Sequence, residues 1–366
     1  MKARAVIVMI LLILSAVVTL VVLDSLYVPL RCGTTITSDT ILTANIGPCS
    51  GDGLYIGHNG ITLNCAWHTI SGAGLNFTNL EEIITVGISL IGLSKVTVEN
   101  CNVTGFQDGF LLNSSSGNTL NGNTANSNGG YGFCLIRSSD NAVTNNTASN
   151  NTPLTRDALP HPTEGDGFNL LVSFGNSLSG NTANSNAEDG FDLFNSNSTT
   201  FTVNTANRNA QLGFAITNST GFSFSGNTAD GDSYGFLITV SNDSALSGNR
   251  ADNDANDGFY FSDFNEGTIS NNTAISNGFS GFDIGVLAND SFSKNLADNN
   301  TYGFFVGVSF GSSFSGNTAK SNSQFGYEDE TGGSGTAGTG NVYTGDICEG
   351  NGEGGSNPSG LCTPQS

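Results

Sequence analysis

A Gly-Phe pair recurs along this chain at a nearly constant interval, and this period constrains the fold more than any other feature. Successive pairs lie 22 or 23 residues apart, except for one step of 35 residues between Gly132 and Gly167. A constant period of this length is typical of a solenoid, in which each copy forms one coil and buries its apolar side against its neighbours. The pairs begin at Gly109, Gly132, Gly167, Gly190, Gly213, Gly235, Gly258, Gly281 and Gly303, and a Gly-Tyr pair follows at Gly326.

Each copy contains short stretches in which apolar and polar residues alternate, and this alternation predicts β-strands rather than helices. In the first stretch an apolar residue follows two positions after the Phe, as with Phe191 and Leu193. The second stretch points one apolar residue inward, as with Phe201. The third contributes an alanine in every copy from Ala125 to Ala319, which predicts a narrow place where nothing larger fits.

Asparagine occupies the predicted corners in two columns that keep the same period. Asparagine tolerates turn conformations, and identical amides that stack at the strand spacing of about 4.8 Å can hydrogen-bond along a column. We therefore interpret these residues as structural. The columns are Asn123, Asn146, Asn181, Asn204, Asn227, Asn249, Asn272, Asn295 and Asn317, and then Asn128, Asn151, Asn186, Asn209, Asn277, Asn300 and Asn322.

The repeat and three segments before it, residues 32–40, 60–72 and 96–105, resemble the right-handed parallel β-helix proteins. The resemblance covers roughly residues 32–330 and includes the NosD-like, carbohydrate-binding and sugar-hydrolase branches of that superfamily. It implies an all-β, right-handed, single-stranded parallel β-helix solenoid of roughly 10–12 coils with 22–23 residues per coil. The superfamily contains lyases, hydrolases, epimerases and adhesins, so the resemblance specifies the fold and leaves the function open.

The chain is predicted to have three parts. Residues 1–31 contain an uncharged stretch from Ala5 to Leu23, which is long enough to span a bilayer. Lys2 and Arg4 precede this stretch, and their positive charge predicts a cytoplasmic N-terminus with the repeats on the outer side of the membrane. No Ala-x-Ala site precedes Cys32, which favours an uncleaved signal anchor over a cleaved signal peptide. Residues 32–330 form the β-helix, with a cap at about 32–60, and residues 331–366 form a Gly-rich linker and a Cys-containing tail that closes the end or stays flexible.

All seven cysteines follow the apolar segment, as expected for an exported protein in which disulfides persist. Cys32 with Cys49 would staple the N-terminal cap, and Cys348 with Cys362 would tie the tail. Cys65 and Cys101 fall in comparable turns of neighbouring coils. Cys134 is left over and is expected to point outward, either as an exposed thiol or as the partner of a differently paired cysteine.

The formal net charge of −21 disfavours nucleic acid and anionic lipid surfaces as partners. It is compatible with neutral glycans or cations, and with polyuronates where calcium bridges the two. Acidity also keeps a long β surface soluble without any further role. The only partners we expect are a carbohydrate or another surface component, and a membrane through the N-terminal segment if that segment is retained.

The 35-residue step adds about 12 residues to one coil, between about 152 and 166, and such departures are where function is commonly grafted onto a solenoid. The candidate catalytic residues there, which could form an acid/base pair beside a sugar-binding groove, are Arg156, Asp157, His161, Glu164, Asp166, Asp189 and Asp192. His161 resembles the histidine of the Asp-Pro-His motif of alginate epimerases, but Leu159 and Pro160 stand where that motif has Asp-Pro. The alternative interpretation is a proline-stiffened loop that shields the edge of a coil.

A second acidic cluster is predicted from adjacent coils, and it is a candidate calcium site or a solvated acidic corner. It consists of Asp230 stacked on Asp252, and of Asp232 stacked on Asp254, where the latter pair replaces asparagines of the corner column. No cofactor other than calcium is indicated. Outward residues of the first strand mix aromatic rings and carboxylates, which suits carbohydrate stacking or contact with a protein. These residues include Asp192, Phe194, Tyr260, Asp283 and Phe305.

Three functional hypotheses follow. The first is an exported, surface-anchored β-helix that binds carbohydrate or another surface component without catalysis. The second is a polysaccharide lyase, hydrolase or epimerase that acts at the insertion loop of residues 152–166. The third is a structural stalk or adhesin. We favour the first because the Asp-rich and Arg/Lys motifs of the pectin-active members are not visible in the repeats.

Overall fold

The structure, a computed structural model, describes residues 30–74, 85–152 and 165–364. The chain divides into two compact units, Met1–Arg31 and Cys32–Ser366. The predicted apolar anchor, residues 5–23, lies outside the described residues. Within the described ranges, no helix has the length and apolar character needed to cross a membrane.

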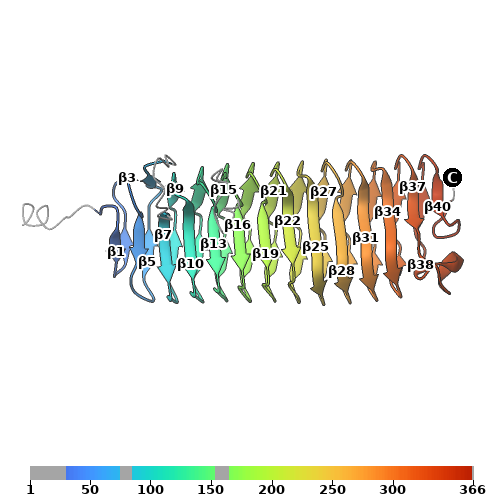
Figure 1. Cartoon of the computed structure of the whole chain (residues 1–366), viewed down its shortest axis with the longest axis horizontal. Coiled ribbons are helices and arrows are strands. Elements are labelled where there is room, and N and C mark those ends of the chain that lie inside the picture. The colour runs from blue at the N-terminus through green and yellow to red at the C-terminus, as the bar shows by residue number, and fades with distance from the viewer. Residues whose placement is uncertain (1–29, 75–84, 153–164, 365–366) are drawn as a thin grey trace, which may run out of the picture. The chain divides into compact units, whose positions relative to one another are not determined.

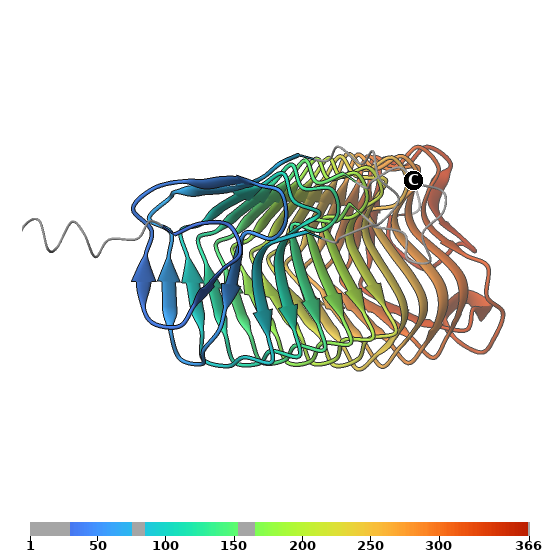
Figure 2. The ribbon, with the colours of Figure 1, turned by 60° about the vertical axis from the view of Figure 1, so that its left-hand side comes forward.

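Cys32–Ser366 is built from short strands that form three parallel sheets, with one strand of each sheet in nearly every coil. The coils follow one another in sequence order from β1 to β40 (Figure 1), and the ribbon turned by 60° shows the corners of successive coils in line (Figure 2). The predicted parallel β-helix of 22–23 residues per coil is therefore confirmed, with about 12 turns.

The first sheet has 14 strands. They are β1 (Thr34–Ile36), β4 (Leu54–Ile56), β7 (Val86–Ile91), β10 (Asp108–Asn113), β13 (Phe133–Ile136), β16 (Phe168–Leu171), β19 (Phe191–Phe194), β22 (Leu212–Thr217), β25 (Tyr234–Asn242), β28 (Phe259–Asn265), β31 (Ser280–Ala288), β34 (Tyr302–Phe310), β37 (Phe325–Asp329) and β40 (Gly354–Asn357).

The second sheet has 13 strands. They are β2 (Thr40–Ile41), β5 (Thr62–Asn64), β8 (Thr97–Glu99), β11 (Thr119–Asn121), β14 (Ala142–Thr144), β17 (Ser177–Ser179), β20 (Thr200–Thr202), β23 (Ser223–Ser225), β26 (Ala245–Ser247), β29 (Thr268–Ser270), β32 (Ser291–Ser293), β35 (Ser313–Ser315) and β38 (Val342–Thr344).

The third sheet also has 13 strands. They are β3 (Ile46–Cys49), β6 (Thr69–Gly72), β9 (Asn102–Thr104), β12 (Thr124–Asn126), β15 (Thr147–Ser149), β18 (Thr182–Asn184), β21 (Thr205–Asn207), β24 (Thr228–Asp230), β27 (Arg250–Asp252), β30 (Thr273–Ile275), β33 (Leu296–Asp298), β36 (Thr318–Lys320) and β39 (Ile347–Glu349). A short 3-10 helix, η1 (Thr336–Gly338), lies before β38.

The Phe of each Gly-Phe pair stacks inside the solenoid. From Phe110 to Tyr327 the ring centroids of neighbouring coils are 4.6 to 4.9 Å apart and the rings are nearly parallel. This distance equals the spacing of hydrogen-bonded strands, so the register of the first sheet sets the stacking.

The Gly of the pair is required by close approach rather than by an unusual backbone angle. A Cβ built at Gly190 would lie 2.6 Å from the carbonyl oxygen of Gly213 and 2.8 Å from the Cβ of Ala206. The alanine column faces the glycine column, which explains why nothing larger than alanine occurs there.

The asparagine columns form continuous ladders of buried amides. Asn204 Oδ1 accepts the backbone N–H and the Nδ2 of Asn181, at 2.9 and 3.0 Å. Its own Nδ2 donates to the Leu178 carbonyl and to Asn227 Oδ1, both at 3.0 Å. The left-handed backbone angle at this corner belongs to the residue before the amide, Val203, and not to the asparagine itself.

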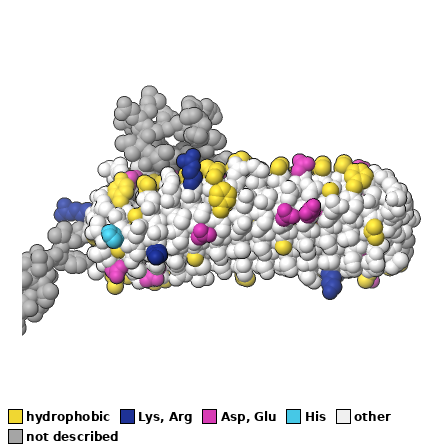
Figure 3. Space-filling view, turned by 90° about the horizontal axis from the view of Figure 1, so that it is seen from below, with side chains coloured by type: hydrophobic (Ala, Val, Ile, Leu, Met, Phe, Trp, Pro, Cys, Tyr) yellow, Lys and Arg dark blue, Asp and Glu magenta, His cyan; other side chains and the backbone are white. Residues whose placement is uncertain are grey.

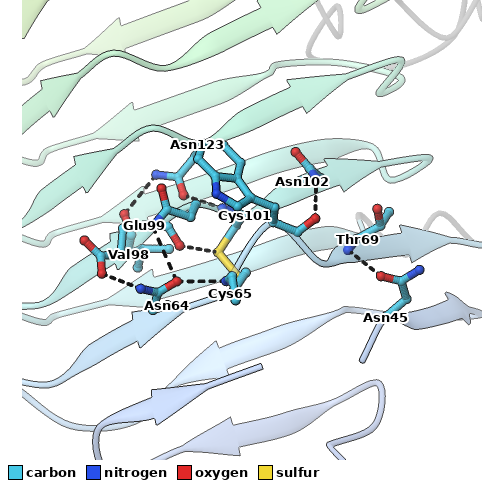
Figure 4. The surroundings of a disulfide bond; sticks show 12 residues. Asn45, Asn64, Cys65, Thr69, Val98, Glu99, Cys101, Asn102 and Asn123 are labelled. Atoms are coloured by element: carbon cyan, nitrogen blue, oxygen red, sulfur yellow. Dashed lines mark hydrogen bonds between the residues drawn. A yellow bond between two sulfur atoms is a disulfide. The ribbon is translucent and has the colours of Figure 1, made fainter. Parts of the chain in front are cut away.

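The three disulfides are Cys32–Cys49, Cys65–Cys101 and Cys348–Cys362, which confirms the pairs suggested by the sequence. Figure 4 shows that Cys65–Cys101 joins neighbouring coils at the start of an asparagine ladder. The backbone N–H of Cys101 donates to Asn123 Oδ1 at 3.0 Å, so the disulfide occupies the ladder position that precedes Asn123.

The C-terminal residues continue the sheets. β38, β39 and β40 pair with β35, β36 and β37, so that the predicted tail forms a further coil. Asp329, which replaces an inward aliphatic residue, accepts hydrogen bonds from the Tyr343 hydroxyl at 2.6 Å and from Asn341 Nδ2 at 3.2 Å. These bonds supply hydrogen-bond donors to a carboxylate that is buried at the end of the core.

Candidate functional site

The outer face of the first sheet carries the candidate functional side chains. Residues that follow the buried Phe point away from the core and align across strands in one outward column. Its members from β10 to β40 are Leu111, Cys134, Asn169, Asp192, Ala215, Leu237, Tyr260, Asp283, Phe305, Glu328 and Asn357.

An aspartate two residues before the Phe binds the next coil in several copies. Asp108 Oδ1 accepts the N–H of Tyr131 at 3.2 Å, and Asp257 Oδ1 accepts the N–H of Ser280 at 2.7 Å. Burial raises the pKa of each of these two carboxyls to about 6, against the lowering effect of the backbone bond. The N–H groups fix the position of these carboxyls, which gives them a structural role.

Next to the insertion, the structure brings together Asp166, Asn169 and Asp192. Asn169 Nδ2 donates to Asp192 Oδ2 at 2.9 Å and to Asp166 Oδ2 at 3.3 Å. Asp189 lies on the next coil, where its backbone N–H donates to Asp166 Oδ1 at 3.0 Å. The insertion leaves the sheet register intact, because Phe133 pairs directly with Phe168. The other candidates, Arg156, Asp157, His161 and Glu164, lie outside the described residues.

Cys134 differs from the expectation of an exposed or alternatively paired thiol. It belongs to the outward column, yet it is a free cysteine with only 1% of its surface exposed. Burial raises the pKa of its thiol well above the ordinary value, and the charges of Asp108, Asp166 and Asp192 raise it further. A thiol in such surroundings stays protonated, which is unsuited to nucleophilic catalysis.

Further along the sheet, aromatic rings surround two carboxyls. Asp283 lies between Tyr260 and Phe305 on the adjacent strands. Tyr234 packs against Tyr260 with ring centroids 6.1 Å apart, and Tyr302 packs against Phe305 at 5.5 Å. We call Tyr234, Asp257, Tyr260, Asp283, Tyr302 and Phe305 the aromatic–acidic patch.

Titratable groups of the patch have raised pKa values. Burial, and then the charge of Asp257, raise the pKa of Asp283 to about 7. Burial also raises the pKa of Tyr234, with contributions from Asp257, Tyr260 and Asp283, so these groups lie close together. Sequence reasoning singled out Tyr260, Asp283 and Phe305, but it missed Tyr234, Asp257 and Tyr302. The signal that could have found them is the column two residues before each Phe.

The four aspartates predicted as a calcium site form two pairs on adjacent coils. Asp230 and Asp252 pair on the outer side of the third sheet, where Arg250 forms an ion pair with Asp252. Asp232 and Asp254, which take the place of asparagines in the corner column, lie in an asparagine ladder, with 3% and 2% of their surfaces exposed. Throughout the described part of the chain, no group of three or more His, Cys, Asp or Glu side chains is arranged to hold a metal ion. The assignment of these four residues to calcium therefore stays a prediction.

On the face drawn in Figure 3, uncharged side chains and backbone cover most of the described surface, and acidic, basic and hydrophobic side chains are scattered among them.

These features define the class: the protein is a right-handed parallel β-helix repeat protein. The family model described as the right handed beta helix region matches residues 86–251, in agreement with the resemblance seen in the sequence. A comparison with curated protein sequences finds no match.

Solved structures share the fold at low sequence identity. The A-module of the mannuronan C-5 epimerase AlgE6 from Azotobacter vinelandii is 16% identical with a TM-score of 0.53, over 89% of this chain and 87% of that one. The A-module of AlgE4 from the same organism is 16% identical with a TM-score of 0.51, over 92% and 91%. The Dettilon tailspike protein is 16% identical with a TM-score of 0.51, over 85% and 60%. At these identities the likeness concerns the fold alone.

Proposed function

We propose that this protein is an exported β-helix that binds carbohydrate through the aromatic–acidic patch, without catalysis. The observation that carries the proposal is the position of Asp283 between Tyr260 and Phe305 in the outward column of the first sheet. The two rings are two strand spacings apart, about 10 Å. They can contact the apolar faces of a sugar chain that lies across the strands.

The chemistry of the patch fits a polyhydroxylated ligand. Aromatic rings with a polar tip, such as Tyr260, combine an apolar face with a hydrogen-bonding group. Carboxyl groups accept hydrogen bonds from sugar hydroxyls when ionised and also donate one when protonated. The net charge of −21 disfavours polyanionic glycans and leaves neutral glycans as the preferred class.

The pKa values of the patch give binding a pH dependence. Asp257 and Asp283 have pKa values raised to about 6 and about 7, mainly by burial. Both carboxyls are negative above this range and increasingly neutral below it. A neutral glycan should therefore bind on both sides of the range, whereas an acidic glycan should bind better below pH 6 than above pH 8.

Export is part of the proposal and rests on the disulfides, which persist in oxidising compartments. Retention at the cell surface by residues 5–23 follows from the sequence and belongs to the proposal as well. Cleavage of that segment would release the same β-helix as a secreted protein.

Binding can be tested by screening the purified β-helix on an array of neutral and acidic glycans. For a glycan that binds, Tyr260→Ala and Phe305→Ala should each weaken affinity roughly five- to tenfold, because each removes an aromatic contact worth about 1 kcal/mol. Phe310→Ala is the matched control, since this exposed ring at the end of β34 lies outside the patch. Equal affinity in all three variants would exclude the patch as the binding site.

A second candidate is a polysaccharide-modifying enzyme acting beside the insertion. The observation that favours it is the arrangement of two carboxylates, Asp166 and Asp192, around the Asn169 amide. Incubation with acidic polysaccharides, with and without calcium, should then give cleavage or epimerisation that is lost in His161→Ala and Asp192→Asn. Turnover of this kind would overturn the non-catalytic proposal. If the protein neither binds a glycan on the array nor modifies a polysaccharide, a structural stalk or adhesin would be favoured.

A further inference from the structure

Asp232 and Asp254 replace asparagines inside one ladder. The hydrogen-bonding groups around each carboxyl indicate whether it is protonated. In the unmodified part of this ladder, Asn209 Nδ2 donates to the Ala183 carbonyl at 3.2 Å and to the side chain of the next coil at 3.1 Å. Asn277 repeats the pattern, with bonds to the Ala251 carbonyl at 3.2 Å and to Asn300 Oδ1 at 3.1 Å. Each position thus needs one acceptor atom and one donor atom.

Asp232 and Asp254 keep the acceptor half of this pattern. Asp232 Oδ1 accepts the backbone N–H and the Nδ2 of Asn209, at 2.6 and 3.1 Å. Asp254 Oδ1 accepts the backbone N–H of Asp232 at 2.9 Å, and the backbone N–H of Asp254 donates to Asn277 Oδ1 at 3.0 Å. The ladder therefore runs through both residues without a change of register.

The second carboxyl oxygen of each aspartate lies where the ladder has its donor nitrogen. A Cβ built at Gly190 would lie 2.8 Å from Asn209 Nδ2, and one built at Gly213 would lie 2.8 Å from Asp232 Oδ2. A Cβ built at Gly258 would likewise lie 2.7 Å from Asn277 Nδ2, and one built at Gly235 would lie 2.6 Å from Asp254 Oδ2. The aspartate Oδ2 atoms thus occupy the positions of the asparagine Nδ2 atoms.

Both of these oxygens are buried, and neither has a hydrogen-bond partner among the described residues. The atoms that would receive a ladder donor at these positions are themselves oxygens: backbone carbonyls, Asp254 Oδ1 and Asn277 Oδ1. An ionised carboxylate would hold a negative oxygen against acceptors with no compensating bond, which is strongly unfavourable in a protein interior.

We propose that Asp232 and Asp254 are proton-binding sites of the ladder, and that in the folded protein at neutral pH each carries a proton on Oδ2 in place of an amide hydrogen. The hydrogen on Asp232 Oδ2 points to Asp254 Oδ1, and the hydrogen on Asp254 Oδ2 points to Asn277 Oδ1. A protonated carboxyl supplies one donor and one acceptor, which restores the pattern of the ladder.

The neighbouring charges act in the same direction. Asp230 and Asp252, in the adjacent outward pair, are the acidic groups nearest to the two sites, and Arg250 forms an ion pair with Asp252 instead of reaching the ladder. Arg208, on the preceding coil, is exposed. Burial raises the pKa of Asp232 to about 7 and that of Asp254 to about 8, and the neighbouring aspartates add to the shift.

A contrasting buried aspartate in a ladder has donors on both of its carboxyl oxygens. Asp346 ends the other ladder and accepts Asn317 Nδ2 and the Tyr327 hydroxyl on Oδ1, at 2.9 and 3.2 Å. Its Oδ2 accepts the backbone N–H of Thr344 at 3.2 Å, so both oxygens of Asp346 have donors.

The consequence is a fold that acid stabilises. The folded pKa values lie above the 3.8 of an unperturbed aspartate, so between about pH 4 and pH 8 the folded state binds more protons than the unfolded state. Stability from these sites is therefore complete below pH 4 and is lost as the pH rises through 7 to 8. The two coils affected lead into Tyr234 and Asp257, so alkaline pH should loosen the coils that carry the aromatic–acidic patch.

The test is thermal unfolding of the disulfide-intact protein between pH 4 and pH 9. Asp232→Asn/Asp254→Asn supplies the amide donor permanently, so its Tm should exceed that of the wild type at pH 8, by at least about 2 °C, and should fall less steeply with pH. The matched control is Asp230→Asn/Asp252→Asn, which removes two charges from the neighbouring outward pair. An unchanged slope in the ladder variant, or equal effects in both variants, would overturn the proposal.

Two further measurements distinguish a proton from a cation, and the first of them does not depend on stability. Infrared spectra of the wild type at pH 7 should show a protonated-carboxyl band that is weaker in the ladder variant; an identical band in the two proteins would contradict the proposal. Calcium or sodium chloride should not raise the Tm of the wild type at pH 8 more than that of the ladder variant. A selective rise would show that a metal ion, and not a proton, lies between the oxygens.

Discussion

The carboxylate of Asp166 accepts the backbone N–H of Asp189 on the next coil, at 3.0 Å. Asp189 in turn accepts the N–H of Leu212 at 2.9 Å, so two stacked carboxylates form a relay of coil-to-coil hydrogen bonds. Two carboxylates stacked at the strand spacing repel each other unless a proton or a cation intervenes. The donated N–H groups supply part of the positive charge that the stack needs.

Removal of one carboxylate from this relay should cost stability. We expect Asp189→Ala to lower the free energy of unfolding by about 1–2 kcal/mol, because the N–H of Leu212 loses its acceptor. Asp189→Asn is the control, since it keeps an oxygen at the same position. Urea denaturation followed by circular dichroism measures both. Equal losses in the two variants would show that charge, rather than the hydrogen bond, is the contribution of Asp189.

The glycine of the Gly-Phe pair should not tolerate even one added methyl group. In Gly190→Ala the new Cβ meets the Gly213 carbonyl oxygen at 2.6 Å and Asn209 Nδ2 at 2.8 Å. We expect a loss of about 1–3 kcal/mol from overpacking. Gly332→Ala is the matched control, because its Cβ would have no atom within 4 Å. A Gly190→Ala protein as stable as the control would refute the close-approach explanation of the repeat.

The ladder amides should be among the least replaceable polar side chains. Asn204 is fully buried and takes part in four hydrogen bonds. Asn204→Ala should therefore destabilise the protein by about 3 kcal/mol or more, since it also leaves buried partners unpaired. Thr202→Ala, at an exposed position of β20, should be nearly neutral. A chemical-denaturation midpoint for Asn204→Ala close to that of Thr202→Ala would contradict this expectation.

The regular part of the fold could be predicted because every coil repeats the same constraints. The columns of Phe191, Ala206 and Asn204 appear in each copy, so the sequence alone fixed their register and their inward direction. The pairing of Cys65 with Cys101 agrees with the comparable turns in which the two residues fall. Residues that repeat with the coil period stack on one another in the structure. Because all coils stack at the same strand spacing, few other arrangements of these columns are possible.

The candidate sites were harder to predict because they lie where the repeat turns. Asp230 and Asp232 are two residues apart but belong to different columns, because Asp232 takes the place of a corner asparagine. In the structure β24 ends at Asp230 and Gly231 adopts a φ of +75°, so the chain turns the corner and Asp232 enters the ladder. Tyr234 and Asp257 were missed for a related reason, since they precede the Gly-Phe pair, where the spacing between copies varies.

The last prediction concerns Cys134, whose thiol should be unreactive in the folded protein. Its side chain is buried, and burial together with the charges of Asp108, Asp166 and Asp192 raises its pKa well above the ordinary value, so little thiolate exists at pH 8. Under non-reducing conditions, a thiol reagent such as dithiobis-nitrobenzoate should label no cysteine in the folded protein and one in guanidinium, because the other six form disulfides. Thr202→Cys provides an exposed thiol as a positive control. If Cys134 of the folded protein reacted as fast as that control, the thiol would be accessible and ionised, and the exclusion of Cys134 as a nucleophile would fail.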